Sequence, residues 1–398
     1  MNLLNTQSRF PILAGELTII DPQGERYVLA GPNEGPHAVI RISDAKIMRR
    51  MMVIPDLYLG EGYMNGMVTI ENGSLYDVLD FCACNLVSRA ADATPSAETA
   101  ANRRDNVVGR AQENVAHHYD LSQALFELFL DNDLQYSCAY FANEFDSLEQ
   151  AQQNKKARIA AKLLLKPGMR VLDIGSGFGG LALYLARCYQ VEVVGVTLSE
   201  EQYEVATARA RAEGLNKLVS FKLLDYRTEN ERYDRIVSVG MFEHVGRGHY
   251  DEFFGKVNEL LRDDGICLLH SIGRMAPPGS AMPWITKYIF PGSYTPSLSE
   301  TTAVVERAGI WITDVEILRL HYALTLRHWH QRFQKNRDRV RALYDERFCR
   351  MWEFYLQLCE IAFRRQNWMV FQMQLAKQVD AVPLTRSYLH SRGLQKRP

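Results

Sequence analysis

The segment 170-RVLDIGSGFGG-180 decides the fold of this chain, because it has the features of a buried strand that runs into a glycine-rich turn and then a helix. Its strand-favouring apolar residues are Val171, Leu172 and Ile174. Gly175, Gly177 and Gly179 permit a tight turn, and an apolar pattern at helical spacing continues over 181–188. Such a turn predicts a cofactor site in which amides at the helix start face the ligand.

The glycine pattern alone leaves two cofactors open. Gly175, Gly177 and Gly180 also satisfy GxGxxG, which is typical of dinucleotide sites such as those for NAD. Asp173 stands two residues before the first glycine, a pattern typical of S-adenosylmethionine (SAM) methyltransferases. The next expected strand, 191–197, ends without the acidic residue that an NAD site uses to bind the ribose. We therefore expect SAM, with NAD as the alternative.

Length and composition exclude several classes of protein. The 398 residues allow two or three domains, and a net charge of -1 argues against a nucleic-acid partner. Seven scattered cysteines without a CxxC pair predict neither a disulfide framework nor a metal site, which favours a reducing cytoplasm. The sequence shows no signal peptide and no apolar run near the roughly 18 residues that a spanning helix needs.

Three regions are expected along the chain. Residues 1–95 mix short strand-like runs with turns and predict a small α+β module, and residues 96–113 have the small and charged composition of a linker. Residues 114–398 form the expected catalytic domain. Within it, residues 273–300 are rich in Pro, Gly and aromatic residues and predict a lid or an acceptor-site insertion.

Alternating strands and helices dominate the expected catalytic domain. Strands are expected at 170–174, 191–197, 218–223, 234–239 and 265–271, and helices at 178–188, 200–213 and 250–262. This alternation predicts an α/β fold with a doubly wound parallel sheet, the Rossmann-like fold of class I SAM-dependent methyltransferases. Earlier helices are expected from Asn114 and after Ser147, where Gln150 gives the spacing of a capping box, and 327–378 returns to helical spacing.

Several stretches, in the same order, resemble the cyclopropane-fatty-acyl-phospholipid synthases. They are NVAHHYDLSQALFELFLDNDLQYSCAYF at 114–141, VLDIGSGFGG at 171–180, VVGVTLSEEQ at 193–202, YDRIVSVGMFEHVG at 233–246 and LLHSIG at 268–273. The resemblance spans most of 114–378, and the amino-terminal module is similar to the lipid-facing domain of the full-length bacterial members. It implies an enzyme that transfers a one-carbon unit from SAM to a cis double bond in a phospholipid acyl chain.

The resemblance also implies site residues. SAM contacts carried over by motif are Tyr136, Ser137, Gly175, Gly177, Thr197, Gln202, Asp225 and Tyr226. The family holds a bicarbonate ion, for which the matching residues here are Cys138, Glu243, His270, Ile272 and Tyr322. Cys359 matches a cysteine that has separately been nominated as the active residue. The chemistry favours a bound anion as base, because no side chain alone is expected to reach into an apolar acyl tunnel.

Other interpretations of these residues stay open. Glu243 and His244 also suit a helix cap, and His270 suits a buried core histidine. Cys138 and Cys359 equally suit small buried apolar positions, and nucleophilic catalysis is disfavoured because an alkene offers no carbonyl. The functional alternatives are a relative that stops at a methyl or methylene branch, a methyltransferase acting on a small amine, and a lipid-binding protein without activity.

The expected partners are the acyl chains of phospholipids at the inner membrane face, where the protein would associate peripherally as a homodimer. The candidate membrane contacts are IMRRMMVIP at 47–55 and the basic tail at 386–397. Both segments are also typical of ordinary solvated surface. His117 and His118 are neighbours on an expected helix and therefore do not face one metal.

Overall fold

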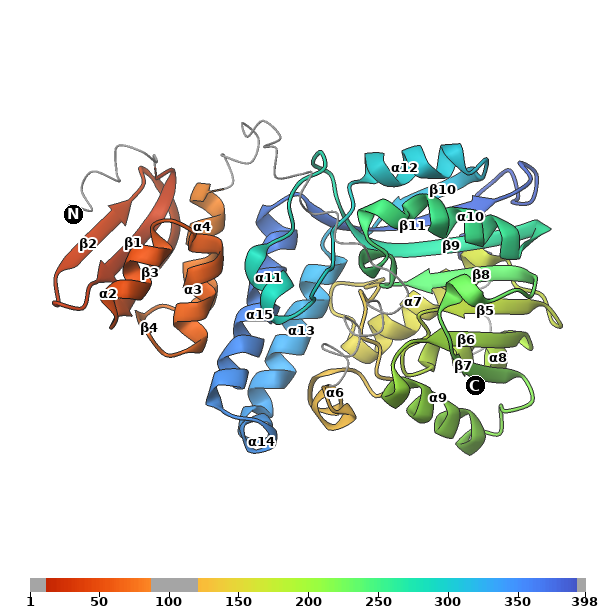
Figure 1. The fold of residues 1–398 in the computed structure, drawn as a ribbon, viewed down its shortest axis with the longest axis horizontal. Helices are drawn as coiled ribbons and strands as arrows, with labels where there is room; N and C mark the ends of the chain where they lie inside the picture. Colours follow the sequence, from red (N-terminus) through yellow and green to blue (C-terminus); the bar gives the residue numbers. More distant parts are fainter. Residues whose placement is uncertain (1–11, 87–120, 392–398) are drawn as a thin grey trace. The chain divides into compact units, whose positions relative to one another are not determined.

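The computed structural model describes residues 12–86 and 121–391, which form two compact units (Figure 1). The first unit comprises the described parts of Met1–Thr99, Ala281–Ile289 and Leu326–Trp368. The second comprises those of Ala100–Ser280, Phe290–Thr325 and Met369–Pro398. The expected linker and the start of the first resembling stretch, including His117 and His118, lie outside the described residues.

The first unit contains a four-stranded sheet in the order β2-β1-β3-β4, which fits the expected α+β character of the amino-terminal module. Its strands are β1 (Ala14–Ile20), β2 (Arg26–Ala30), β3 (Asn33–Ile42) and β4 (Val68–Asn72). Its helices are α2 (Ala45–Met51), α3 (Pro55–Met64), α4 (Leu75–Leu86), α11 (Pro283–Tyr288), α14 (Arg337–Leu343), α15 (Glu346–Arg365) and most of α13 (His321–Lys335).

The boundaries of the first unit differ from the expected domain boundaries, because 281–289 and 326–368 were expected in the catalytic domain. Helix α15 packs on both α3 and α4. Gly60 of α3 allows a close approach, since a Cβ there would lie 2.4 Å from the Trp284 indole nitrogen. The Trp284 ring in turn lies 4.7 Å from the Phe354 ring. Part of the expected insertion is therefore core of the first unit.

The second unit is built on a seven-stranded sheet in the order β10-β11-β9-β8-β5-β6-β7. Its strands are β5 (Arg170–Ile174), β6 (Glu192–Thr197), β7 (Val219–Leu223), β8 (Tyr233–Val239), β9 (Leu261–Arg274), β10 (Trp311–Ile317) and β11 (Trp368–Ala376). The pairs β7–β6, β6–β5, β5–β8 and β8–β9 are parallel, and β10–β11 is antiparallel. The α/β prediction is confirmed, with a mixed rather than wholly parallel sheet.

Helices cover both faces of this sheet, as parallel strands require. They are α6 (Gln123–Phe129), α7 (Leu148–Leu163), α8 (Gly180–Tyr189), α9 (Glu200–Ala212), α10 (Tyr250–Leu260), α12 (Leu298–Arg307) and α16 (Tyr388–Ser391), with short 3-10 helices η3 (Tyr226–Thr228), η4 (Phe242–His244) and η5 (Arg247–His249). Val171 joins the core under α7, α8 and α9, whereas Leu172 joins the core under α10 and α12.

Two local predictions need correction. Residues 368–376 form strand β11 rather than continuing a helix, because their apolar run is buried on both faces and such a run has no period that separates strand from helix. Helix α7 begins after Ser147, whose hydroxyl accepts the Gln150 amide at 3.2 Å. The Gln150 side chain donates to Asn154 instead, so only half of the capping box forms.

Candidate active site

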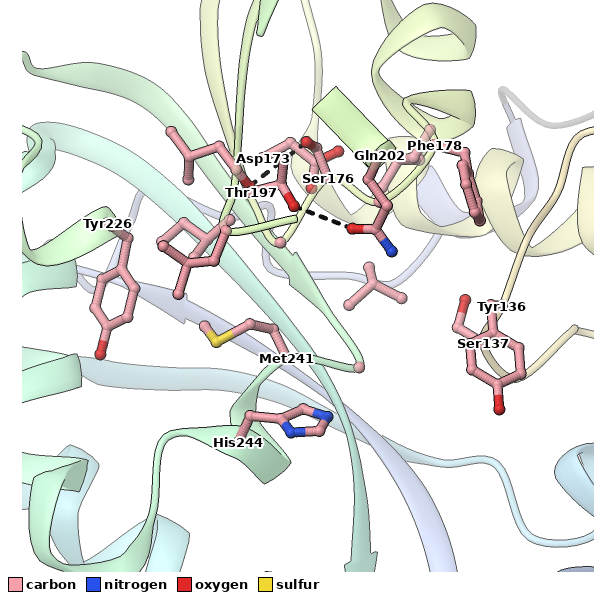
Figure 2. Close-up of a pocket in the computed structure, with 18 of the residues that line it drawn as sticks. Tyr136, Ser137, Asp173, Ser176, Phe178, Thr197, Gln202, Tyr226, Met241 and His244 are labelled. Atoms are coloured by element: carbon pink, nitrogen blue, oxygen red, sulfur yellow. Dashed lines mark hydrogen bonds between the residues drawn. The ribbon is translucent and has the colours of Figure 1, made fainter. Parts of the chain in front are cut away.

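A pocket opens at the carboxyl ends of β5, β6, β7 and β8, and all of its lining residues belong to the second unit. Figure 2 shows Asp173, Thr197 and Gln202 along one side of this pocket and Met241 with His244 along the other. All eight residues expected to contact SAM line it: Tyr136, Ser137, Gly175, Gly177, Thr197, Gln202, Asp225 and Tyr226. The sequence motifs therefore meet in one cavity.

The glycine turn has the backbone shape that its residues predict. Gly175, Gly177 and Gly179 have φ values of 80°, 53° and 81°, in the left-handed region that favours glycine. The amides of Gly175 and Ser176 donate to the Val196 carbonyl at 2.9 and 3.0 Å. These two amides therefore anchor the turn to β6, and they precede the start of helix α8, whose amides are the ones expected to face the ligand.

Thr197 and Gln202 form one polar unit at the end of β6. The Thr197 hydroxyl donates to Gln202 Oε1 at 3.0 Å and accepts the Ser199 amide at 3.2 Å. Because the Gln202 oxygen is engaged, its amide nitrogen is left to face the pocket, as Figure 2 shows. Thr197 thus orients Gln202, which presents a hydrogen-bond donor to a ligand.

Asp225 follows β7 and forms an ion pair with Arg227. Its carboxylate accepts the Arg227 backbone amide and Nε, both at 3.0 Å, and Nη2 at 2.6 Å. Tyr226 packs its ring edge-on against Phe253, 5.5 Å between centroids. Asp225 is therefore an oriented, ion-paired acid at the pocket edge, and Arg227 lines the pocket with it.

A buried lysine organises the segment that carries Tyr136 and Ser137. Lys155 of α7 is fully buried and donates to Gln135 Oε1 at 2.7 Å and to Ser137 Oγ at 2.8 Å. Burial lowers its pKa to about 8. The Tyr136 ring packs edge-on against Phe126, 5.2 Å between centroids. Sequence reasoning missed Lys155, because only the fold shows that its side chain reaches the pocket wall.

Asp173 is the most perturbed acid of the pocket. Burial raises its pKa to about 7, and the Lys155 charge opposes that rise. Its Oδ2 has no hydrogen-bond partner among the described residues. A buried carboxyl oxygen of this kind calls for a ligand, and a cation would favour the ionised form. The cavity therefore fits SAM, whose sulfonium and amino groups are positive.

Glu243 lies beside the pocket and is linked to β9. Its Oε1 accepts the Ile272 amide at 2.6 Å, and its backbone carbonyl accepts the Tyr294 amide at 2.9 Å. Burial raises its pKa to about 7, and its Oε2 has no partner among the described residues. These contacts differ from a helix cap, and an acid that titrates near neutrality suits proton transfer.

His270 is buried on the same strand, β9. Its Nδ1 lies 3.1 Å from Gln372 Nε2, and burial lowers its pKa to about 3. Its backbone carbonyl accepts the Gly240 amide at 2.9 Å, which holds the end of β9 against the loop that carries Glu243. The structure thus brings His270, Ile272 and Glu243 together.

Cys138 and Tyr322 lie on two different segments, and a hydrogen bond links these segments. Cys138 is buried, donates to the Ala139 carbonyl at 3.3 Å and directly follows pocket residue Ser137. The Ala139 amide donates to Thr325, one turn along α13 from the buried Tyr322. Burial raises the pKa of the Cys138 thiol, so the thiol is protonated at neutral pH.

Cys359 belongs to the first unit, whereas the other candidate site residues belong to the second. It is buried in α15, and burial raises its thiol pKa to about 12. A thiolate nucleophile is therefore disfavoured there at neutral pH.

Sequence reasoning also missed two pocket residues, Met241 and His244. His244 was weighed with Glu243 but not chosen, and only His244 lines the pocket. Glu243 and His244 both lie in η4, and a 3-10 helix turns by a third of a circle per residue. Phe242 therefore packs in the core, Glu243 meets β9 and His244 faces the cavity, where burial lowers its pKa to about 4. A strand-end motif does not reveal this rotation.

Comparison with known families decides the classification of this site. The family model described as mycolic acid cyclopropane synthetase matches residues 108–373. The chain belongs to this family. The predicted family and the SAM-methyltransferase fold are thereby confirmed.

Two curated relatives cover most of both chains. The Escherichia coli K12 cyclopropane-fatty-acyl-phospholipid synthase is 39% identical over 366 residues, covering 87% of this chain and 90% of its own. A probable fatty acid methyltransferase of Pseudomonas putida is 36% identical over 354 residues, covering 87% and 88%. The solved mycolic acid cyclopropane synthase CmaA1, complexed with SAH and CTAB, is 35% identical with a TM-score of 0.63, covering 66% of this chain and 97% of its own.

Membrane contact was also expected. Among the described residues, no helix is both long enough and apolar enough to cross a bilayer. Of the two candidate segments, 47–55 is described in full, whereas residues 392–398 of the basic tail are not. Arg386 of that tail pairs with Asp314 at 2.6 Å.

Proposed function

We propose that this protein is a cyclopropane-fatty-acyl-phospholipid synthase that transfers a methylene unit from SAM to the cis double bond of phospholipid acyl chains. The observation that carries the proposal is the convergence of all eight motif-predicted residues on one pocket in a member of this family. The names of the relatives supply the lipid substrate class.

In this proposal the residues of the pocket hold and orient SAM. Gly175 and Gly177 let the ligand approach the backbone, and the Gln202 amide donates to its sugar hydroxyls. Asp173 balances its positive charge with the carboxyl oxygen that has no partner among the described residues. Bound SAM supplies an electrophilic methyl group. The chain contributes positioning, which supplies at most roughly 7 to 11 kcal/mol toward such a transfer.

The alkene is a weak nucleophile, and its attack leaves a positive charge on the neighbouring carbon of the lipid. Ring closure then requires loss of a proton from the added methyl group. The buried Glu243, with a pKa raised to about 7, is placed to accept or relay that proton, and the neutral His270 can donate a hydrogen bond. Exclusion of water by the apolar surroundings protects the cationic stage.

We also propose bicarbonate as the small base beside these residues. Glu243 Oε2, which has no hydrogen-bond partner in the described part of the chain, and the neutral His270 fit such an anion, as does the nearby charge of Lys155. The Ile272 amide already donates to Glu243, so Ile272 would act mainly by holding that acid. Bound bicarbonate supplies a proton acceptor small enough for the cavity. Turnover in carbonate-depleted buffer, followed by carbonate addition, tests this: full activity without carbonate contradicts it.

The decisive experiment incubates the full chain with labelled SAM and vesicles of unsaturated phospholipid, and then analyses the fatty acids. A mass gain of one CH2 with loss of the alkene signals supports cyclopropanation. The same gain with an alkene retained indicates a methyl- or methylene-forming relative instead and contradicts cyclopropanation. No mass gain despite SAM binding indicates a lipid-binding protein and contradicts the proposal.

Peripheral membrane association is part of the proposal. The turn between α2 and α3 exposes three consecutive apolar residues, with exposed fractions of 40% for Met52, 77% for Val53 and 42% for Ile54. Arg49 and Arg50 directly before them are exposed as well. Apolar side chains beside arginines suit an anionic lipid surface, with about 1 kcal/mol for each charge near it. The full-length M52S/V53S/I54S variant should bind anionic vesicles more weakly and keep its turnover on detergent-dispersed lipid.

We also propose a homodimer, formed through the amino-terminal module at 1–95. Sedimentation of the purified full chain measures this directly, and a monomer at the assay concentration contradicts it.

A further inference from the structure

His270 stands at the buried end of a chain of hydrogen-bonded polar side chains, and the proposed mechanism assigns no role to the other members of this chain. Gln372 of β11 is fully buried and joins His270 Nδ1 through its Nε2, at 3.1 Å. Its Oε1 accepts Lys162 Nζ at 2.8 Å. Lys162 of α7, itself buried, also donates to Glu316 Oε2 at 2.6 Å. Arg158 completes the chain with a 2.7 Å hydrogen bond to Glu316.

The chemistry of these groups fixes the direction of every hydrogen bond. A lysine ammonium has hydrogens only to donate, so the Gln372 oxygen must face Lys162. The Gln372 nitrogen therefore faces His270 and donates to Nδ1. A neutral imidazole whose Nδ1 accepts carries its proton on Nε2.

We propose that Gln372 and Lys162 are positioning residues that hold His270 in the neutral tautomer with its proton on Nε2. This inference rests on the proposed function, because it gives His270 one task there: to donate a hydrogen bond to the bound anion or to the reacting groups, and never to act as the base. The acid–base work then falls to Glu243 and the anion.

The charges around His270 agree with a neutral ring. Lys155 and Lys162 of α7 disfavour the imidazolium, and Glu316 of β10 favours it more weakly, so that burial and the two lysines keep the pKa low. Glu243, from η4, meets β9 two residues away at Ile272. The register supports the geometry as well, because Glu316 and Gln372 are direct partners in the β10–β11 pair.

A plain structural role for the chain of polar groups is the competing explanation, and the strand offers a matched control. Gln374 lies two residues along β11 and is equally buried. It donates to the Lys162 carbonyl at 2.6 Å, and in the described part of the chain it forms no hydrogen bond with His270. Gln374→Met therefore removes a comparable buried amide without touching the histidine.

The test is nitrogen NMR of the histidine rings in the full-length protein labelled with 15N-histidine, with the His270→Gln variant identifying the His270 signals. We expect the wild-type ring to carry its proton on Nε2 and not to titrate from about pH 5 to about pH 8. Gln372→Glu, whose carboxylate can only accept from the ring, should move the proton to Nδ1. Gln374→Met should leave the wild-type tautomer unchanged.

Kinetics provide the second readout. Gln372→Glu and Gln372→Met should lower kcat about 10- to 100-fold, as expected for one hydrogen bond to a charged group, with the KM for SAM nearly unchanged. A wild-type proton on Nδ1, an unchanged tautomer in both variants, or an equal kcat loss in Gln374→Met overturns the inference. If the wild-type protein does not cyclopropanate, the proposed function fails, whereas the NMR result still decides the tautomer.

Discussion

Two regions at the carboxyl ends of the same sheet differ in how they are built. The glycine-turn side takes its polar contacts from residues close in the sequence, such as Thr197 with Gln202 five residues later. The Glu243–His270 side depends on distant ones, since Gln372 is 102 residues from His270 and 210 from Lys162. In the proposed function, the first region is a locally encoded binding site, and the second is an acid–base cluster that forms only when distant strands of the sheet have paired. This difference predicts that changes on the first side alter binding and those on the second alter chemistry.

The largest effect expected from this comparison is in Glu243→Gln. The amide keeps the shape but cannot exchange a proton, so kcat should fall about 10²- to 10⁴-fold while the affinity for SAM is retained. Turnover assays and titration calorimetry measure the two quantities. Glu259→Gln, an exposed acid in α10, serves as the control and should behave as wild type. Weakened SAM binding with unchanged kcat would contradict the division between the two sides.

Gly175→Ala should have the opposite effect to Glu243→Gln, because it should weaken SAM binding rather than lower kcat. A side chain at φ 80° is strained, and its Cβ would lie 2.9 Å from the Met241 Cβ. We expect the SAM Kd to rise about tenfold, from a strain of roughly 1 to 2 kcal/mol. Gly255→Ala is the matched control, because its Cβ meets nothing within 4 Å and helix α10 favours alanine. Equal SAM affinity in both variants would show that the turn does not need glycine.

The pH dependence of SAM binding separates the two buried acids. Asp173 has a pKa near 7, and its ionised form attracts a cationic ligand. The SAM Kd should therefore fall as pH rises through about 7, by up to roughly tenfold, and SAH, which lacks the sulfonium charge, should respond less. Asp173→Asn should remove this pH dependence, whereas Glu243→Gln should leave it. Calorimetry at several pH values checks both, and an opposite slope would be inconsistent with the proposed role of Asp173.

The smallest effect is expected outside both regions. Cys359→Ala should keep turnover within about twofold and cost about 1 kcal/mol of stability, because the buried thiol, with a pKa near 12, acts as an apolar side chain. Turnover and thermal unfolding measure this. A loss of turnover as large as that of Glu243→Gln would restore Cys359 as an active residue.

The same contrast explains how far the sequence predicts this structure. Strand β5 has the predicted bounds of 170–174, because apolar strand residues and glycines act over a few positions. Six of the eight SAM residues converge because they end or follow the parallel strands β5, β6 and β7, whose carboxyl ends lie side by side. Tyr136 and Ser137 instead lie in the segment that Lys155 of α7 binds. Gln372 escaped prediction because its segment has no diagnostic period and its partners lie on β9 and α7. The sequence also did not predict that His244 faces the pocket while Glu243 faces β9, because this difference depends on the turn of η4.

The first unit is assembled from three separate stretches of the chain, and this limits how the gene can be shortened. Helix α15 buries thirteen of its side chains and packs on α3 and α4, which are encoded far upstream. A protein shortened to start after the expected linker would lack α3 and α4. The apolar surface of α15 that they cover would then be exposed to solvent, and the product should precipitate or bind chaperones. Engineers seeking a minimal enzyme therefore need to redesign the α15 surface rather than simply move the start codon.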